Sequence, residues 1–184
     1  MRIVGGTYRG RRLPARLPPG VRPTSDRVRE AIFDILGSMG AIEGASVLDL
    51  FCGSGAMGIE AASRGASSVT FVDSDFRVVE AVRENLTSLG VSIPGGVLCR
   101  RLPEWICESS EFDVAFCDPP YDFDDWGTLL RDLKAGVAVL ESNRPVDGPS
   151  NWSVGKTRRY GGTIVTVARS TSIRSRFFET VASQ

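Results

Sequence analysis

The stretch Asp118-Pro119-Pro120-Tyr121 sets an acid, two rigid residues and an aromatic ring directly after the apolar run VAFC. Proline fixes φ, lacks an N–H and pushes its predecessor toward an extended conformation, so the stretch predicts a pre-shaped turn at the end of a strand. There the Asp118 carboxylate and the Pro119 carbonyl can accept the hydrogens of a planar amine and so fix the direction of its lone pair toward a reacting group. Tyr121 can stack on a nucleobase, a contact of about 1–3 kcal/mol. In isolation the stretch also fits a plain Pro-Pro turn whose tyrosine covers the edge of the core.

A glycine-rich loop, residues 53–58 (GSGAMG), follows the run VLDLF and opens a stretch with helical spacing. Glycines allow a tight turn and a close approach to a ligand, and the following helix N-terminus favours polar groups. Asp73 ends the next apolar run, twenty residues after Gly53, where a carboxylate can bind two ribose hydroxyls. The pattern therefore predicts a nucleoside-cofactor site, to which Phe51, Ser54 and Gly55 are also assigned.

The same spacing fits a nicotinamide dinucleotide site, but two features favour S-adenosyl-L-methionine. Asp49 lies four residues before Gly53, where a carboxylate would repel a pyrophosphate and can pair with an amino cation. The chain also has no histidine for the acid and base work of hydride transfer, and little length for a separate substrate domain.

Composition is that of an ordinary globular domain: 184 residues, 42% hydrophobic and 24% charged. No apolar run approaches the roughly 20 residues of a membrane span, and the N-terminus lacks a secretory h-region, so we expect a cytoplasmic protein. The four cysteines show no metal-binding spacing, which predicts reduced thiols and no metal site. A monomer is the default expectation.

Charge is distributed unevenly although the net charge is zero. Residues 1–29 hold eight arginines and one acid, a net charge of +7 that the remaining residues balance with −7. This excess predicts a polyanion-binding arm, because the planar guanidinium binds phosphate and stacks on bases; a solvated leader is the simpler alternative. If the polyanion is RNA, as the family resemblance described below implies, the expected contacts are Arg2, Tyr8, Arg9, Arg11, Arg12, Arg22, Arg27 and Arg29.

Short apolar runs alternate with helical stretches from residue 45 onward. This alternation predicts a parallel sheet wrapped on both faces, with runs at 45–51, 67–73, 95–100, 112–118 and 136–142 as strands. Helices are expected between them, including LPEWICES at 102–109. The Gly-Gly turn at 161–162 predicts an antiparallel hairpin that closes the sheet.

Three segments follow from these patterns. Residues 1–22 are expected to form a basic β-hairpin extension, 23–170 the catalytic domain with its leading helix, and 171–184 a C-terminal tail. In the leading helix an apolar stripe includes Val28 and Ile32, and Thr24 or Ser25 provides the cap. Either residue could also have a substrate role if it lies near the cofactor cleft.

The chain resembles the RsmD family of bacterial enzymes, which methylate the N2 amine of one guanine in 16S ribosomal RNA. The resemblance rests on RIVGGTYRGRRL, RPTSDRVREAIFDIL, VLDLFCGSGAMGIEA, FVDSD and DPPY, of which RPTSDRVRE is the most specific. It implies an α/β class I methyltransferase fold, Rossmann-like, with seven strands, an antiparallel last strand and a small N-terminal β-rich extension.

The resemblance also assigns roles to residues. Asp49, Gly53 and Gly55 match the cofactor loop, Asp73 the ribose-binding acid, and Asp118, Pro119, Pro120 and Tyr121 the catalytic motif, in which Asp118 also meets the cofactor. Relatives place Asp or Asn near adenine where this chain has Arg100, Arg101 and Leu102. Arginine cannot accept a hydrogen bond, so we expect backbone groups at Arg101 and Leu102 to take that role.

The implied partner is 16S rRNA or the small ribosomal subunit. A DNA adenine or cytosine enzyme, a protein glutamine enzyme and a non-catalytic nucleic-acid-binding module are the alternatives.

Overall fold

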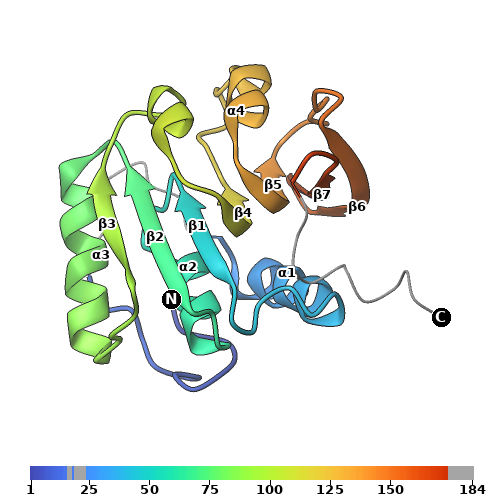
Figure 1. The fold of residues 1–184 in the computed structure, drawn as a ribbon. Helices are drawn as coiled ribbons and strands as arrows, with labels where there is room; N and C mark the ends of the chain where they lie inside the picture. The colour runs from blue at the N-terminus through green and yellow to red at the C-terminus, as the bar shows by residue number, and fades with distance from the viewer. Residues whose placement is uncertain (16–17, 19–23, 174–184) are drawn as a thin grey trace.

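A seven-stranded sheet organises the computed structural model, which describes residues 1–15, 18 and 24–173 (Figure 1). The strand order is β3-β2-β1-β4-β5-β7-β6. The strands are β1 (Ser46–Leu50), β2 (Ser68–Asp73), β3 (Gly95–Cys99), β4 (Phe112–Cys117), β5 (Ala135–Ser142), β6 (Trp152–Tyr160) and β7 (Thr163–Ser170). Strands β1 to β5 are parallel and β7 is antiparallel to both of its neighbours. The predicted α/β architecture and closing hairpin are confirmed.

Helices cover both faces of the sheet. They are α1 (Asp26–Ser38), α2 (Ala56–Ser63), α3 (Phe76–Leu89) and α4 (Trp126–Asp132), with a 3-10 helix, η1, at Glu104–Glu108. Helices α1, α2 and α3 pack against one face through the larger hydrophobic cluster. Helix α4 and η1 cover the other face. The LPEWICES stretch was expected to be a helix. It forms one short 3-10 helix of five residues that begins directly after Pro103, a length typical of 3-10 segments.

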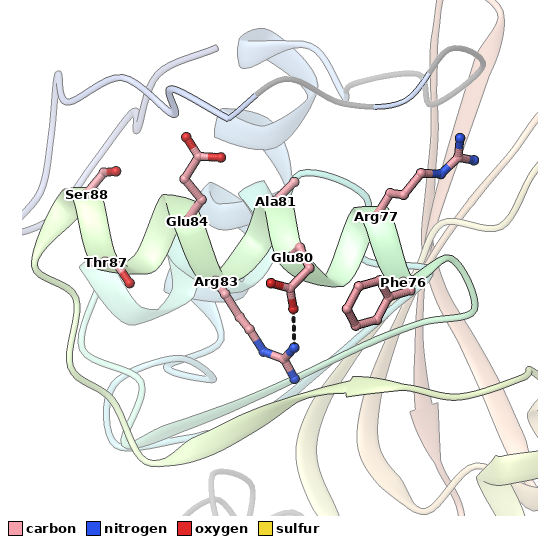
Figure 2. Close-up of a pocket in the computed structure, with 8 residues that line it drawn as sticks. All are labelled: Phe76, Arg77, Glu80, Ala81, Arg83, Glu84, Thr87 and Ser88. Carbon is pink, nitrogen blue, oxygen red and sulfur yellow. Dashed lines mark hydrogen bonds and ion pairs between the residues drawn. The ribbon is translucent and has the colours of Figure 1, made fainter.

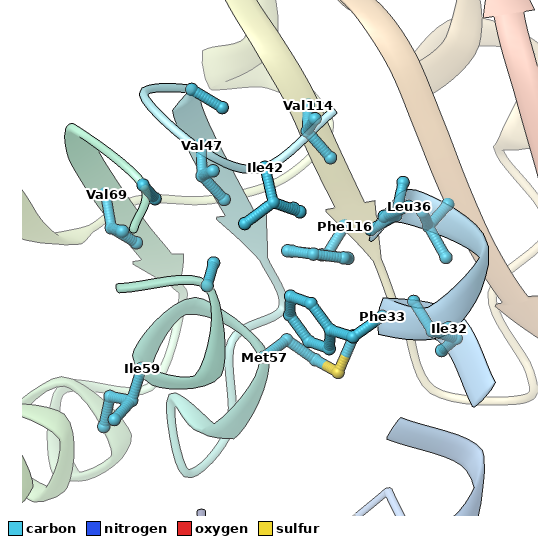
Figure 3. Packing of buried hydrophobic residues seen from close by; sticks show 14 of the residues in the cluster. Ile32, Phe33, Leu36, Ile42, Val47, Met57, Ile59, Val69, Val114 and Phe116 are labelled. Atoms are coloured by element: carbon cyan, nitrogen blue, oxygen red, sulfur yellow. The ribbon is translucent and has the colours of Figure 1, made fainter. Parts of the chain in front are cut away.

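The larger cluster joins α1 to the centre of the sheet. In Figure 3, Phe33 of α1 lies against Phe116 of β4 and beside Met57 of α2. The two phenyl centroids are 5.5 Å apart, with the rings tilted by 50°. This packing fixes α1 relative to the carboxyl end of β4.

Local sequence explains where α1 begins. Ser25 is extended, and its hydroxyl accepts a hydrogen bond from the Val28 amide at 3.3 Å, as an N-cap should. Buried Val28, Ile32 and Leu36 then recur at helical spacing and form the stripe that faces the sheet.

The N-terminal extension is less regular than the predicted β-hairpin. Residues 1–15 contain one isolated antiparallel bridge, between Arg2 and Arg12, and no longer strand. Backbone hydrogen bonds from Ile3 to Arg11, Gly10 to Ile3 and Leu13 to Met1 join the two arms around the turns at Gly6 and Gly10. Helix α2 also holds the segment, because its Glu60 carboxylate accepts the amide hydrogens of Val4 and Gly5 at 2.8 and 2.7 Å. The extension is thus a short, irregular hairpin.

Part of the predicted segmentation lies outside the described residues. The boundary at residues 22 and 23 falls there, as do residues 174–184 of the proposed tail. Among the described residues, no helix combines the length and apolarity needed to cross a membrane.

Candidate active site

A cavity of about 530 Å³ opens where the parallel strands end. Strands β2 and β3 lie on one side of β1, and β4 and β5 lie on its other side, so the strand order reverses between β1 and β4. The cavity lies at this topological switch point, where open α/β sheets bind ligands. Its lining draws on the loops after β1, β2 and β4, the start of α1 and the β6–β7 turn: Thr24, Ser25, Val28, Asp49, Phe51, Cys52, Gly53, Ser54, Ala56, Met57, Asp73, Ser74, Asp75, Val78, Asp118, Pro119, Pro120, Tyr121, Glu141, Tyr160 and Thr163.

The glycine loop forms one wall of the cavity through an unusual backbone path. Phe51 has a φ of 55°, a left-handed conformation that costs a non-glycine residue about 1–3 kcal/mol. Gly55 has a φ of 73° at the N-cap of α2, and its amide donates to the Cys52 carbonyl at 2.7 Å. At Gly58 a Cβ would lie 2.3 Å from the Phe71 ring, so glycine is required for α2 to pack this close to β2.

Asp49 lies at the floor of the cavity, 3% exposed, within β1. The Gly58 amide donates to its Oδ2 at 2.8 Å. Burial raises the pKa of the Asp49 carboxyl well above its usual value; the Gly58 hydrogen bond offsets part of this, and Asp118 and Asp73 add repulsion. A cation that enters the cavity would relieve this cost, because an opposite charge favours the ionised carboxylate.

Asp73 is the last residue of β2 and organises the adjacent loop. Its two carboxylate oxygens accept the amide hydrogens of Gly53 at 3.3 Å and Asp75 at 3.0 Å. The predicted acid at the end of the second strand is thus tied to the glycine loop, which places it at the cavity wall.

Asp118 is the first residue after β4 and meets a side chain distant in sequence. The Thr24 hydroxyl donates to its Oδ2 at 3.1 Å and lies 3.5 Å from Oε2 of Glu141, the penultimate residue of β5. A hydroxyl has one proton, so it can donate to only one of the two carboxylates at a time. Thr24 therefore joins the two acids at the ends of β4 and β5.

Tyr121 is held at both its side chain and its backbone. Its hydroxyl lies 2.9 Å from Oγ1 of Thr163, at the start of β7. The Arg144 guanidinium donates to the carbonyls of Tyr121 and Phe123 at 3.2 and 3.0 Å and pairs with Asp124. The ring and the loop that follows the two prolines are therefore fixed before any ligand binds.

The lining is strongly acidic. Five carboxylates line the cavity, from Asp49, Asp73, Asp75, Asp118 and Glu141, and no lysine or arginine is present among the described lining residues. Such a site repels pyrophosphate and other anions and attracts cations and hydrogen-bond donors. Burial also raises the pKa values of the Cys52 and Cys117 thiols beside it, which keeps both protonated and unreactive.

Most of the predicted catalytic and cofactor-binding residues meet in this cavity, and three do not. Gly55 lies just behind the wall, against Val82 and Phe71. Arg101 points away, with its side chain 86% exposed and 3.5 Å from Glu104. Leu102 packs on the α4 face of the sheet. The expected adenine contacts involve the backbone groups of Arg101 and Leu102, and they stay a prediction.

Arg29 is a correction. We expected it to contact RNA, but its side chain is fully buried between α1 and α2. Its Nε lies 3.5 Å from the equally buried Glu60 carboxylate, and its guanidinium donates to the carbonyls of Arg2 and Thr24. Arg29 therefore fastens the N-terminal extension and the Thr24 backbone to the domain.

The remaining arm residues divide into two groups. Arg2, Arg9, Arg11, Arg12 and Arg27 are exposed, and Arg22 lies outside the described residues. Tyr8 is half-buried beneath Arg11, whose guanidinium donates to the Leu89 carbonyl. Because Leu89 ends α3 and Phe76 begins it beside the cavity, the Tyr8 end of the arm lies roughly 20 Å from the site.

Sequence reasoning missed Glu141, Thr163 and Arg144. Glu141 carried a signal, since it is an acid at the carboxyl end of an apolar parallel strand. Thr163 follows a Gly-Gly turn and has no such signal. Arg144 acts only through three-dimensional proximity to the loop after β4.

A second depression, of about 560 Å³, lies along the outer face of α3 (Figure 2). It contains the exposed Arg83–Glu80 ion pair and Phe76, which is 61% exposed. None of the five carboxylates of the cavity lines it, so it is not the candidate active site.

Comparison with known proteins agrees with this geometry. The family model described as Conserved hypothetical protein 95 matches residues 1–169. The Ribosomal RNA small subunit methyltransferase D proteins of Haemophilus influenzae and Escherichia coli K12 are 35% and 33% identical, covering 88% of this chain and 89% and 85% of theirs.

Solved structures show the same likeness. The Escherichia coli protein yhhF superposes with a TM-score of 0.81 at 31% identity, covering 92% of this chain and 97% of its own. A hypothetical protein of Thermus thermophilus gives 0.75 at 33% identity, covering 91% and 98%. The resemblance found in the sequence is confirmed: the chain belongs to the family of Conserved hypothetical protein 95, together with these small-subunit rRNA methyltransferases.

Proposed function

We propose that this protein is an S-adenosyl-L-methionine-dependent methyltransferase that modifies the exocyclic N2 amine of a guanine in 16S rRNA. The observation that carries the proposal is the acidic cavity: five carboxylates and no basic side chain among its described lining residues, at the switch point of the sheet. The names and extents of the relatives support the same class of reaction and substrate.

The cavity residues fit this cofactor. Asp49 is a buried carboxylate that a cationic amino group would stabilise in its ionised form. Asp73, which the Gly53 amide ties to the glycine loop, would accept hydrogen bonds from ribose hydroxyls, and the glycines would let the backbone approach the ligand. When bound, S-adenosylmethionine supplies an electrophilic methyl group on a sulfonium.

The loop after β4 would present the amine. The Asp118 carboxylate and the Pro119 carbonyl accept its hydrogens, which fixes the direction of the nitrogen lone pair. The proton that the nitrogen loses when the N–C bond forms can pass to Asp118. Tyr121 stacks on the base, and its hydroxyl contact with Thr163 sets the plane of the ring.

Exposed arginines of the N-terminal arm, Arg2, Arg9, Arg11, Arg12 and Arg27, would bind phosphates of the RNA. The half-buried Tyr8 would contact RNA away from the target base. We propose that the protein acts in the cytoplasm as a monomer without a metal ion; within the described residues no cluster of three or more potential metal ligands occurs.

Transfer of labelled methyl from S-adenosylmethionine tests the proposal. The substrates are small ribosomal subunits and naked 16S rRNA, both from cells that lack this protein. Label recovered as N2-methylguanine at one site is the expected result, and comparison of the two substrates shows which form is used. Absence of label on both, with cofactor binding intact, would overturn the proposal and direct the search to DNA amines and protein amides.

A further inference from the structure

The β6–β7 hairpin carries a concentration of positive charge that the proposed function does not use. Residues 151–170 contain four basic residues and no acidic residue, in a chain whose net charge is zero. Three of them, Lys156, Arg158 and Arg159, lie on β6, and each is exposed. Within the described part of the chain, none of these three forms an ion pair.

Strand β6 is the outer edge of the sheet, and neither of its faces is covered. Every residue from Ser153 to Arg159 is exposed, on both sides of the strand. Its partner β7 is buried from Thr163 to Ala168. In Figure 1 the hairpin stands at the end of the sheet beyond α4 and α1.

The hairpin is continuous with the candidate active site. Tyr160 ends β6 and Thr163 begins β7, and both line the cavity. The register pairs Tyr160 with Thr163 and Arg158 with Val165, so Arg158 and Tyr160 project from the same face of the hairpin. Two strand residues span about 7 Å, so the Arg158 backbone lies about 7 Å from Tyr160 at the cavity mouth, within reach of the arginine side chain.

We infer that this hairpin, with Lys156, Arg158 and Arg159, is a second RNA-contact surface that binds the phosphates flanking the target base. The inference rests on the proposed function for the identity of the RNA. An acidic cavity cannot hold phosphates, so a base that enters it must leave its backbone on a neighbouring positive surface. The hairpin is such a surface, joined to the cavity through Tyr160.

Protection of an open sheet edge is the other use of charged residues on β6, because charge on an edge strand prevents pairing with another chain. Charged side chains of either sign can protect a sheet edge, whereas only positively charged side chains attract the phosphates of RNA. The absence of any acid in residues 151–170 favours RNA.

The test compares two triple variants with equal loss of charge. One replaces Lys156, Arg158 and Arg159 with Gln; the control replaces the exposed Arg77, Arg83 and Arg131, on α3 and α4, with Gln. Binding of each to naked 16S rRNA and to assembled small ribosomal subunits is measured over a salt series, together with binding of S-adenosylhomocysteine and the melting temperature. These solvent-exposed changes leave the core intact.

The hairpin variant should bind RNA roughly tenfold or more weakly, and its plot of log affinity against log salt should be shallower by about two, as expected for three lost phosphate contacts. Cofactor affinity should stay unchanged and the control should bind RNA nearly normally. Equal losses in both variants, or none in the hairpin variant, would overturn the inference. So would a loss confined to assembled subunits, which would indicate a ribosomal protein as the partner. The binding assay does not depend on methyl transfer. If the proposed reaction is wrong, the unsubstituted protein will fail the methyl-transfer assay, whatever the two variants show in RNA binding.

Discussion

The cavity and the β6–β7 hairpin share Tyr160 and Thr163 as a border, yet they carry opposite charge. The described lining of the cavity has five carboxylates and no lysine or arginine, and residues 151–170 carry four basic side chains and no acidic one. The carboxylates are held by backbone amides and hydroxyls, as at Asp49 and Asp118, whereas Lys156, Arg158 and Arg159 project into solvent.

This difference separates the two parts of one substrate. A nucleobase is neutral and rich in hydrogen-bond donors, so the acidic cavity can accept it, while the phosphates on either side of it are repelled. The target base must therefore leave the stack and enter alone, with its backbone outside on positive charge. The charge boundary at Tyr160 thus favours a flipped base.

The largest expected effect comes from the acid at the centre of the cavity. Asp118→Ala removes the main acceptor for the amine and should lower the rate of methyl transfer by roughly 10²–10³, with cofactor affinity nearly unchanged. Single-turnover transfer to rRNA and equilibrium binding of S-adenosylhomocysteine measure the two quantities. Asp122→Ala, an exposed acid in the same loop, is the control. Normal turnover of the Asp118 variant would refute the mechanism.

Arg29 lies next to the N-terminal arm, but it belongs neither to the acidic cavity nor to the basic hairpin, because its side chain is buried. Arg29→Met removes one of the two cations beside the buried Glu60 carboxylate, which keeps Arg64 at 2.8 Å, and it takes a donor from the carbonyls of Arg2 and Thr24. The loss should cost about 1–3 kcal/mol. For a chain of this length that corresponds to a fall in melting temperature of roughly 2–12 °C. Arg83→Met, which breaks an exposed pair with Glu80, should change it little. An unchanged melting temperature with weaker RNA binding would return Arg29 to the RNA contacts.

Asp49→Asn tests whether the cavity is built for a cation. The pKa of Asp49 is raised in the fold above its unfolded value of about 3.9, so its stabilising contribution exists below pH 4 and is lost as pH rises through the raised value. The Asn variant without cofactor should therefore melt higher than the original protein near pH 7 to 8, and the difference should vanish toward pH 4.

The same change should weaken binding of S-adenosylhomocysteine, whose amino group loses its counter-ion. In the original protein this affinity should fall as pH drops through the raised pKa, because a proton must then leave Asp49 on binding. Asp34→Asn, on the exposed face of α1, is the control for both measurements. Equal melting temperatures of the Asp49 variant and the original protein at all pH values would contradict this account.

Much of this architecture was predictable, because local patterns determine it. The strand runs, Asp49, Asp73 and the loop after β4 were placed by the alternation of apolar runs and by glycine and proline, whose backbone preferences do not depend on distant contacts. The antiparallel hairpin followed from the Gly-Gly turn alone.

The errors arose where tertiary contacts determine the outcome. Arg29 is part of an arginine-rich stretch, and its burial depends on Glu60, 31 residues later, so its sequence neighbours gave no sign of it. Arg101 and Leu102 were placed by analogy with the end of a strand, and their side chains lie outside the cavity lining, while the role of their backbone groups stays a prediction. The basic character of β6 was visible in the sequence, but its exposure on both faces and its border with the cavity were not.

The smallest expected effect concerns Thr24, which joins the cavity to the start of α1. Thr24→Val keeps the shape of the side chain but removes the donor to Asp118, a charged hydrogen bond worth about 1.5 kcal/mol or more, so the maximal rate should fall roughly tenfold. Cofactor affinity should not change, and Thr24→Ser should restore the rate. Ser38→Ala is the control, because Ser38 is an exposed residue at the other end of α1 and does not line the cavity, so methyl transfer should stay intact. If Thr24→Val reduced stability but not the rate, its contact with Asp118 would be structural and would not be needed to orient the carboxylate for catalysis.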